Sequence, residues 1–197
     1  MRGSRFPPEV RWPGVLGRCM GPRHRIVEDG LNGRTLCGFH PDGDPLYGGR
    51  HVHSCLQVYD RVDLLVLYLG INDILSDPGL TAEDLGDELS EVLEILGSRL
   101  AELAVVLLTP LPLRLAAAEL RLYGRAAETA LRAVDVYCRV GKRSGCAVVE
   151  TGAVIQASAA DGVHIDAEGH VRLGKHLCGL IRGRFGGGAQ DLDHDGH

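Results

Sequence analysis

The segment Asp161-Gly-Val-His164 brings together two side chains that can activate a nucleophile. Histidine is the usual general base, and a carboxylate three residues earlier can hold the imidazole in one tautomer. Acyl transfer also needs hydrogen-bond donors for the oxyanion that develops at the attacked carbonyl. Gly33 and Asn72 lie in two earlier loops that suit this role. The sequence therefore predicts His164 as base, Asp161 as its orienter, and Gly33 and Asn72 as an oxyanion hole.

Buried strands are expected to position these residues. Continuous apolar runs predict parallel strands at residues 62–69, 104–109 and 146–149, and a weaker run predicts one at 25–28. In such α/β sheets, ligands gather at the carboxyl ends of the strands. The four candidate residues all lie in loops that follow predicted strands, so we expect them on one rim of the sheet.

Helical periodicity separates the strands. It predicts helices over residues 85–100, 115–140 and 167–184, of which the first and the third show one apolar face. Thr81, followed three residues later by Asp84, is typical of a capping box that opens the first of them. The alternation of strands and helices predicts an α/β fold with a parallel sheet.

Composition limits the class of protein. With 197 residues, 45% of them hydrophobic and 24% charged, the chain can bury the core of one domain, expected over residues 1–185. The glycine-rich residues 186–197 are expected to be disordered. A formal net charge of −5 without a basic stripe argues against nucleic-acid binding. No apolar run is long enough to span a membrane and no signal core is present, so we expect a cytoplasmic protein without a membrane partner.

The cysteines and histidines suggest no metal centre. Six widely spaced cysteines form no Cys-x-x-Cys pair, and we expect them to be reduced and mostly buried. His51 and His53 lack an evident third ligand. The acidic and histidine residues of the tail have no fixed geometry. Any metal binding is therefore expected to be adventitious.

Four stretches of the chain match one family pattern: Arg5-Phe-Pro-Pro-Glu-Val-Arg-Trp-Pro-Gly-Val-Leu16, Val27-Glu-Asp-Gly-Leu-Asn-Gly-Arg-Thr35, Leu69-Gly-Ile-Asn-Asp73 and Asp161-Gly-Val-His164. Together they resemble the SGNH, or GDSL, hydrolase family, most closely its bacterial arylesterase and acyltransferase branch. The resemblance covers residues 5–183.

This resemblance implies a flavodoxin-like, three-layer α/β/α sandwich and a covalent acyl-serine intermediate. The oxyanion hole would consist of Gly33, Asn72 and the serine's own N–H, with His164 as base and Asp161 as orienter. It also implies a small-molecule ester substrate and no metal or organic cofactor. A homo-oligomer is compatible with it.

The chain departs from the family at its beginning. The family opens with a buried strand that ends in Gly-Asp-Ser, whose serine is the nucleophile, and this segment is absent here. Ser4 does not occupy that position, and no other serine of the chain follows a strand at a sharp turn, so no nucleophile is assigned in this chain. The absent strand would be central in a sheet ordered 2-1-3-4-5, and its loss would leave two ladders unpaired. We therefore expect poor folding and favour a truncated gene model over a pseudoenzyme, unless the 25–28 strand closes directly onto the 62–69 strand.

Three functions compete on these grounds. The first is a Ser-His-Asp esterase that transfers short acyl groups from esters to water or another alcohol. The second is a non-catalytic binding protein that keeps the cleft of the family without the nucleophile. A flavodoxin-like nucleotide binder is disfavoured, because neither a Gly-x-Gly-x-x-Gly loop nor a P-loop occurs.

Overall fold

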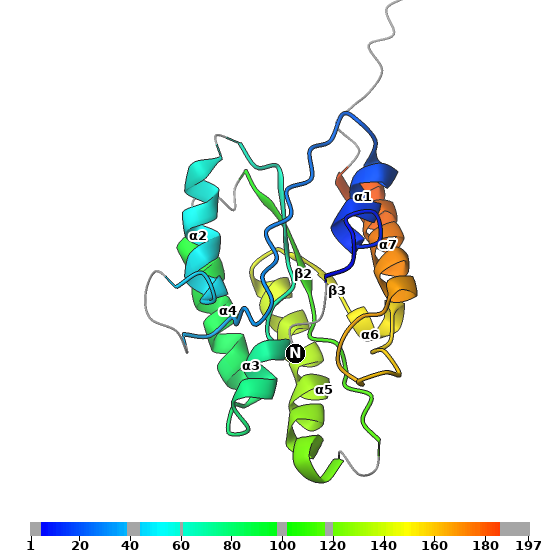
Figure 1. Cartoon of the computed structure of the whole chain (residues 1–197). Coiled ribbons are helices and arrows are strands. Elements are labelled where there is room, and N and C mark those ends of the chain that lie inside the picture. The colour runs from blue at the N-terminus through cyan, green and yellow to red at the C-terminus, as the bar shows by residue number, and fades with distance from the viewer. Residues whose placement is uncertain (1–4, 39–43, 60, 98–101, 117–119, 186–197) are drawn as a thin grey trace, which may run out of the picture. The chain divides into compact units, whose positions relative to one another are not determined.

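The computed structural model of the chain describes residues 5–38, 44–59, 61–97, 102–116 and 120–185 (Figure 1). They belong to two compact units, of which one comprises residues 29–164 and contains the sheet. The described part of the other unit comes from both ends of the chain, before Asp29 and after His164. The predicted disordered tail lies outside the described residues.

Three parallel strands form the sheet in the order β1-β2-β3. They are β1 (Leu64–Leu67), β2 (Ala104–Leu108) and β3 (Ala147–Val149). Leu65 lies opposite Val105 in the first ladder. Each strand lies within one of the three strong apolar runs, and the order is the one expected for the last three strands of a flavodoxin-like sheet. These strand predictions are therefore confirmed.

The predicted strand at residues 25–28 is wrong, because this segment forms no strand. A strand needs a neighbour to complete its ladder of hydrogen bonds, and the described sheet contains only β1, β2 and β3. Among the described residues, β1 consequently lies at an edge of the sheet. Its residues Leu64, Leu65 and Val66 are only half-buried, whereas Val106 and Leu107 of β2 are fully buried.

Both faces of β2 are covered. Val105 and Leu107 belong to the main hydrophobic core, which they share with residues of the helices of the same unit. Successive side chains of a strand point to opposite faces. Val106 and Leu108 therefore point the other way, and they are buried as well. The parallel α/β fold predicted from the sequence is confirmed in this respect.

Helices α2 (Gly48–Val58), α4 (Ala82–Leu96) and α5 (Leu120–Arg143) contribute side chains to this core. Helix α4 begins with the predicted capping box: Asp84 N–H donates to Thr81 Oγ1 at 3.1 Å, and Thr81 N–H donates to Asp84 Oδ2 at 2.8 Å. This helix packs closely on α5. A Cβ at Gly86 would lie only 2.4 Å from a side-chain atom of α5, so the glycine permits the approach.

In the second unit, helix α1 (Trp12–Met20) packs on α7 (Ala167–Phe185). A Cβ at Gly174 would lie 2.7 Å from the Trp12 carbonyl oxygen, which again shows a close approach. A disulfide joins Cys19 to Cys178 across these helices. The expectation that all cysteines are reduced is therefore wrong for this pair, which lies 159 residues apart in sequence and is brought together only by the packing of α1 on α7. Among the described residues, no helix combines the length and the apolar character that a membrane crossing requires.

Candidate functional site

Asp161 and His164 form a hydrogen-bonded pair in the loop that follows β3 and the short helix α6 (Thr151–Val154). His164 Nδ1 lies 2.8 Å from Asp161 Oδ2, so that Nδ1–H can donate to the carboxylate and Nε2 is left for a substrate proton. The side chain of His164 is 81% exposed. The Asp161 side chain that faces it is less exposed, at 46%.

The turn itself holds the Asp161 carboxylate in place. Asp161 Oδ1 accepts the backbone N–H groups of Val163 and His164, both at 2.9 Å. Burial by itself raises the pKa of the Asp161 carboxyl, but these hydrogen bonds and the His164 ring outweigh it and hold the pKa below its usual value. Asp161 therefore stays ionised when the imidazole gains a proton. Gly162 makes the turn possible, because its φ of 68° is unfavourable for other residues.

Backbone hydrogen bonds fix this loop to its surroundings. Ser158 N–H donates to the His164 carbonyl at 2.7 Å, and Gly162 N–H donates to the Ser158 carbonyl at 2.8 Å. Arg114, in the segment after β2, donates its N–H to the Gly162 carbonyl at 2.8 Å. The segments that follow β2 and β3 are thus joined at the carboxyl edge of the sheet.

Asn72 follows β1 in the first turn of the short helix α3 (Ile71–Ser76). Gly70, with a φ of 110°, turns the chain sharply from the strand into this helix. The Asn72 Nδ2 group donates to the Arg34 carbonyl at 2.8 Å, which places the amide against the loop that contains Gly33. An amide nitrogen carries two hydrogens, so one N–H of Asn72 remains for a ligand. The structure thus brings Asn72 and the Gly33 turn together.

Asp73 is a positioning residue that the sequence analysis did not assign. Its carboxylate is fully buried and accepts Leu36 N–H at 2.9 and 3.0 Å and Cys37 N–H at 2.7 Å. Burial, followed by the nearby Asp73 carboxylate, raises the pKa of the Cys37 thiol well above its usual range. Asp73 therefore ties the segment after Gly33 to α3. In the sequence, an Asn-Asp pair after a strand is indistinguishable from an ordinary turn.

Among the described residues, the aliphatic hydroxyls within two residues of a strand end belong to Thr109 and Thr151. Both residues are fully buried, and Thr151 Oγ1 donates to the Thr109 carbonyl at 2.8 Å. Neither hydroxyl is therefore presented to a substrate. Ser4 lies outside the described residues, and no described serine directly follows a strand.

The four predicted site residues thus occupy two fixed pairs, Gly33 with Asn72 and Asp161 with His164. The first pair is joined to the end of β1 and the second follows β3, and parallel strands direct their carboxyl ends to the same edge. That both pairs border one ester-binding pocket stays a prediction.

His51 and His53, considered as a possible metal pair, have different partners. His53 Nε2 lies 2.9 Å from Gln57 Nε2, whereas His51 Nε2 lies 2.7 Å from Asp29 Oδ2 and 3.0 Å from Cys55 Sγ. The expectation that no third ligand exists is therefore wrong for His51. The sequence could not reveal this cluster, because Asp29 lies 22 residues before His51.

Comparison with solved structures places this arrangement in a known fold. The aryl esterase of M. smegmatis superposes with a TM-score of 0.81 at 24% identity, covering 91% of this chain and 88% of its own. Est24, a carbohydrate acetylesterase from Sinorhizobium meliloti, gives 0.83 at 22% identity with coverages of 93% and 89%. A carbohydrate acetylesterase family member from the same organism gives 0.80 at 28% identity with coverages of 93% and 90%.

These enzymes belong to the SGNH hydrolases. The chain has the SGNH hydrolase fold. The resemblance inferred from its sequence is confirmed in the tertiary structure, and the parallel α/β sheet is the one that these neighbours share. No protein-family model matches the sequence, and no curated protein matches it significantly. The similarity to the SGNH hydrolases therefore comes from the fold and the short motifs.

Proposed function

We propose that this protein is an SGNH-type esterase, which cleaves short-chain esters of small molecules by acyl transfer. The observation that carries the proposal is the hydrogen bond between His164 Nδ1 and Asp161 Oδ2, in a loop fixed at the carboxyl edge of a sheet with the SGNH fold. An acid, an imidazole and a directed amide at such an edge suit an acyl-transfer enzyme.

In the proposed reaction, the ester carbonyl oxygen accepts hydrogen bonds from the Gly33 N–H and from Asn72 Nδ2–H. His164 Nε2 removes the proton of the attacking hydroxyl, and Asp161 stabilises the resulting imidazolium. The tetrahedral intermediate collapses when the imidazolium returns the proton to the leaving alcohol. Water, or a second alcohol in an acyltransferase reaction, then attacks the acyl group by the same route.

The nucleophile of this reaction is not assigned to any serine of the chain. The family resemblance supplies it as the serine of a Gly-Asp-Ser segment that precedes the matched residues. For the given residues alone, without such a serine, the expected activity is a slow hydrolysis in which His164 activates water directly. In the serine protease subtilisin, loss of the catalytic serine lowers kcat by about six orders of magnitude.

Hydrolysis of 4-nitrophenyl acetate by paired variants tests the proposal. His164→Gln should abolish the protein-dependent rate, whereas His176→Gln, at another exposed histidine, should leave it unchanged. Asn72→Ala should lower the rate by about 10²–10³-fold, the effect of losing one oxyanion donor. Asn32→Ala, next to Gly33 and exposed, is its control.

If the hydrolysis rate of the chain is too low to measure, a fusion protein provides the test. In this fusion, an apolar strand ending in Gly-Asp-Ser is joined ahead of the first residue of the chain. This fusion should react with a serine-directed fluorophosphonate at the added serine, and both labelling and turnover should depend on His164. Labelling of a serine within the given chain, or turnover that survives His164→Gln, contradicts the assignment. Ester binding without turnover in a folded fusion favours the binding-protein function instead.

A further inference from the structure

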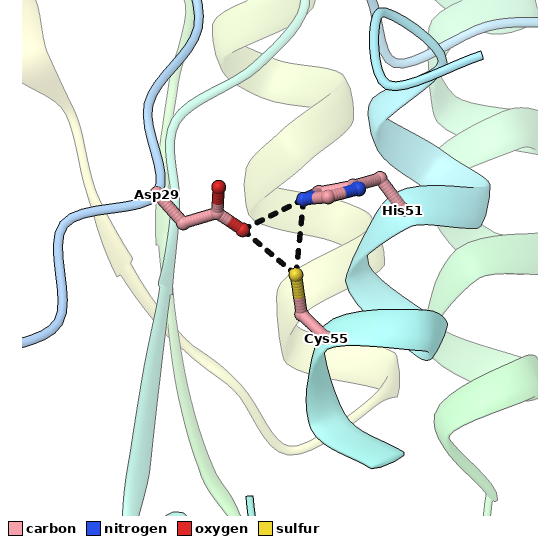
Figure 2. Close-up of side chains that lie close together, drawn as sticks. All are labelled: Asp29, His51 and Cys55. Atoms are coloured by element: carbon pink, nitrogen blue, oxygen red, sulfur yellow. Dashed lines mark hydrogen bonds and ion pairs between the residues drawn. The ribbon is translucent and has the colours of Figure 1, made fainter. Parts of the chain in front are cut away.

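Three side chains with metal-binding atoms converge outside the proposed esterase residues (Figure 2). His51 and Cys55 are four residues apart on α2, so they lie one turn apart on the same face of the helix. Asp29 faces them from the segment that leads into the Gly33 turn. Asp29 Oδ2 lies 2.7 Å from both His51 Nε2 and Cys55 Sγ, and the last two atoms are 3.0 Å apart.

The proton count shows that hydrogen bonds alone cannot satisfy all three close contacts of this triangle. A carboxylate has no proton to donate, a neutral imidazole has one N–H and a thiol has one S–H. Two protons cannot satisfy three close contacts, so one pair of atoms always approaches without a hydrogen bond. A cation between the three atoms would take the place of the protons on Nε2 and Sγ and interact with all three lone pairs.

Asp29 is oriented for such a role by a buried arginine. Arg34 donates through Nη1 to the Asp29 carbonyl, and the same nitrogen lies 3.5 Å from Asp29 Oδ1. The Arg34 side chain is only 9% exposed and is fixed by a second hydrogen bond to the Pro45 carbonyl at 2.8 Å. Oδ1 is therefore engaged by Arg34, and Oδ2 is directed to the cluster. Groups that hold a ligand from behind in this way are usual in protein metal sites.

We propose that Asp29, His51 and Cys55 form a binding site for one divalent zinc-type ion, with the fourth position open to water. Thiolate and imidazole ligands favour Zn²⁺ over Mg²⁺ or Ca²⁺, which prefer oxygen. Tetrahedral Zn²⁺ with bonds of about 2.0–2.3 Å holds its ligand atoms about 3.3–3.6 Å apart. From their present separations of 2.7–3.0 Å, the atoms of each pair would have to move apart by about 0.3–0.9 Å. The Asp29 side chain is 49% exposed and that of His51 25% exposed, so solvent can reach the fourth position.

Ion binding has a defined proton balance. The Cys55 thiol loses its proton to solvent and the neutral imidazole moves its proton from Nε2 to Nδ1, so that carboxylate and thiolate together neutralise the two charges of the ion. The competing interpretation of the cluster is a nucleophilic cysteine. Burial and the Asp29 carboxylate raise the pKa of the Cys55 thiol to about 11, which leaves it protonated and unreactive at neutral pH.

Cobalt(II) titration of the full chain provides the test, because a bound cobalt ion shows a thiolate charge-transfer absorption only when a cysteine is its ligand. The tail contains His194 and His197 but no cysteine. A background with both tail histidines replaced by alanine removes their competing sites, and work under argon keeps Cys55 reduced. We expect one equivalent of cobalt to produce the band and one equivalent of Zn²⁺ to remove it.

Matched variants identify the ligands. Cys55→Ser should abolish the band, whereas Cys138→Ser, at another partly buried free cysteine, should retain it. His51→Ala and Asp29→Asn should each weaken Zn²⁺ binding by about 10-fold or more, and His53→Ala should not. Circular dichroism checks that each variant is folded. A folded chain without the band, or a band that survives Cys55→Ser, overturns the proposal. Because the readout is binding rather than turnover, the esterase proposal stands or fails separately.

Discussion

Replacing Asp73 by alanine is expected to destabilise the protein by about 2–4 kcal/mol. The fully buried carboxylate accepts the N–H groups of Leu36 and Cys37, at distances of 2.7–3.0 Å. Alanine leaves both donors without a partner, and each buried unsatisfied donor costs about 1–3 kcal/mol. The lower part of the summed range is expected, because the substitution also removes a buried charge and its desolvation penalty.

Asp73→Asn separates geometry from charge. Asp73 Oδ1 alone lies within 3.0 Å of both N–H groups, so an asparagine oxygen at that position still accepts both. The amide nitrogen would replace Oδ2, which now lies 2.9 Å from Leu36 N. The free energy of unfolding of Asp73→Asn should therefore lie between that of the wild type and that of Asp73→Ala. Asp77→Ala is the matched control, because in the described part of the chain its carboxylate accepts a single exposed N–H, that of Gly79.

Urea unfolding followed by circular dichroism at pH 7 measures these differences, and thermal unfolding gives a second estimate. For a chain of this length, about 2–4 kcal/mol corresponds to a Tm lower by about 4–16 °C. Asp77→Ala should change the free energy of unfolding by less than about 1 kcal/mol. The reasoning is refuted if Asp73→Ala and Asp77→Ala destabilise the protein equally.

Further predictions concern packing, pH and redox state. Gly86→Ala should destabilise the protein by about 1–3 kcal/mol through its clash with α5, whereas Gly124→Ala, which meets nothing within 4 Å, should be neutral or stabilising in urea unfolding. Burial raises the pKa of Glu88, so the stability associated with this group is greatest below its usual pKa of 4.5 and declines as pH rises through the raised value. Glu88→Gln should therefore be at least as stable as the wild type at pH 7 and indistinguishable from it at pH 4. A Glu88→Gln variant that is less stable than the wild type at pH 7 would contradict burial as the cause of the raised pKa. Thiol titration of the denatured, unreduced protein should find four thiols if Cys19 and Cys178 are bonded, and six would show the pair to be reduced.

Much of the fold was predictable where the signal is local or continuous along the chain. The apolar runs at 62–69, 104–109 and 146–149 each contain a strand, because such runs are buried whichever neighbours cover them. Thr81 and Asp84 form their capping box within one turn of helix. The strand expected at 25–28 failed for the opposite reason, since a strand forms only beside a neighbouring strand, and the described sheet consists of β1, β2 and β3.

The contacts of the candidate site likewise include some that the sequence predicts and some that it does not. Asp161 and His164 meet through a turn of four residues, so their hydrogen bond could be predicted from their spacing. The anchoring of the Gly33 turn could not, because it depends on a buried carboxylate 37 residues away in the case of Asp73 and Leu36. Nothing in the spacing of acidic residues distinguishes Asp73 from those that remain exposed.

The sequence by itself determined the α/β class, the capped start of α4 and the pairing of an acid with an imidazole, because hydrophobic periodicity, capping and short turns act over a few residues. Only the tertiary structure decided that Cys19 meets Cys178 and that Asp29 joins His51 and Cys55. Contacts of this kind depend on how helices and loops pack, and packing is a property of the whole chain rather than of any segment.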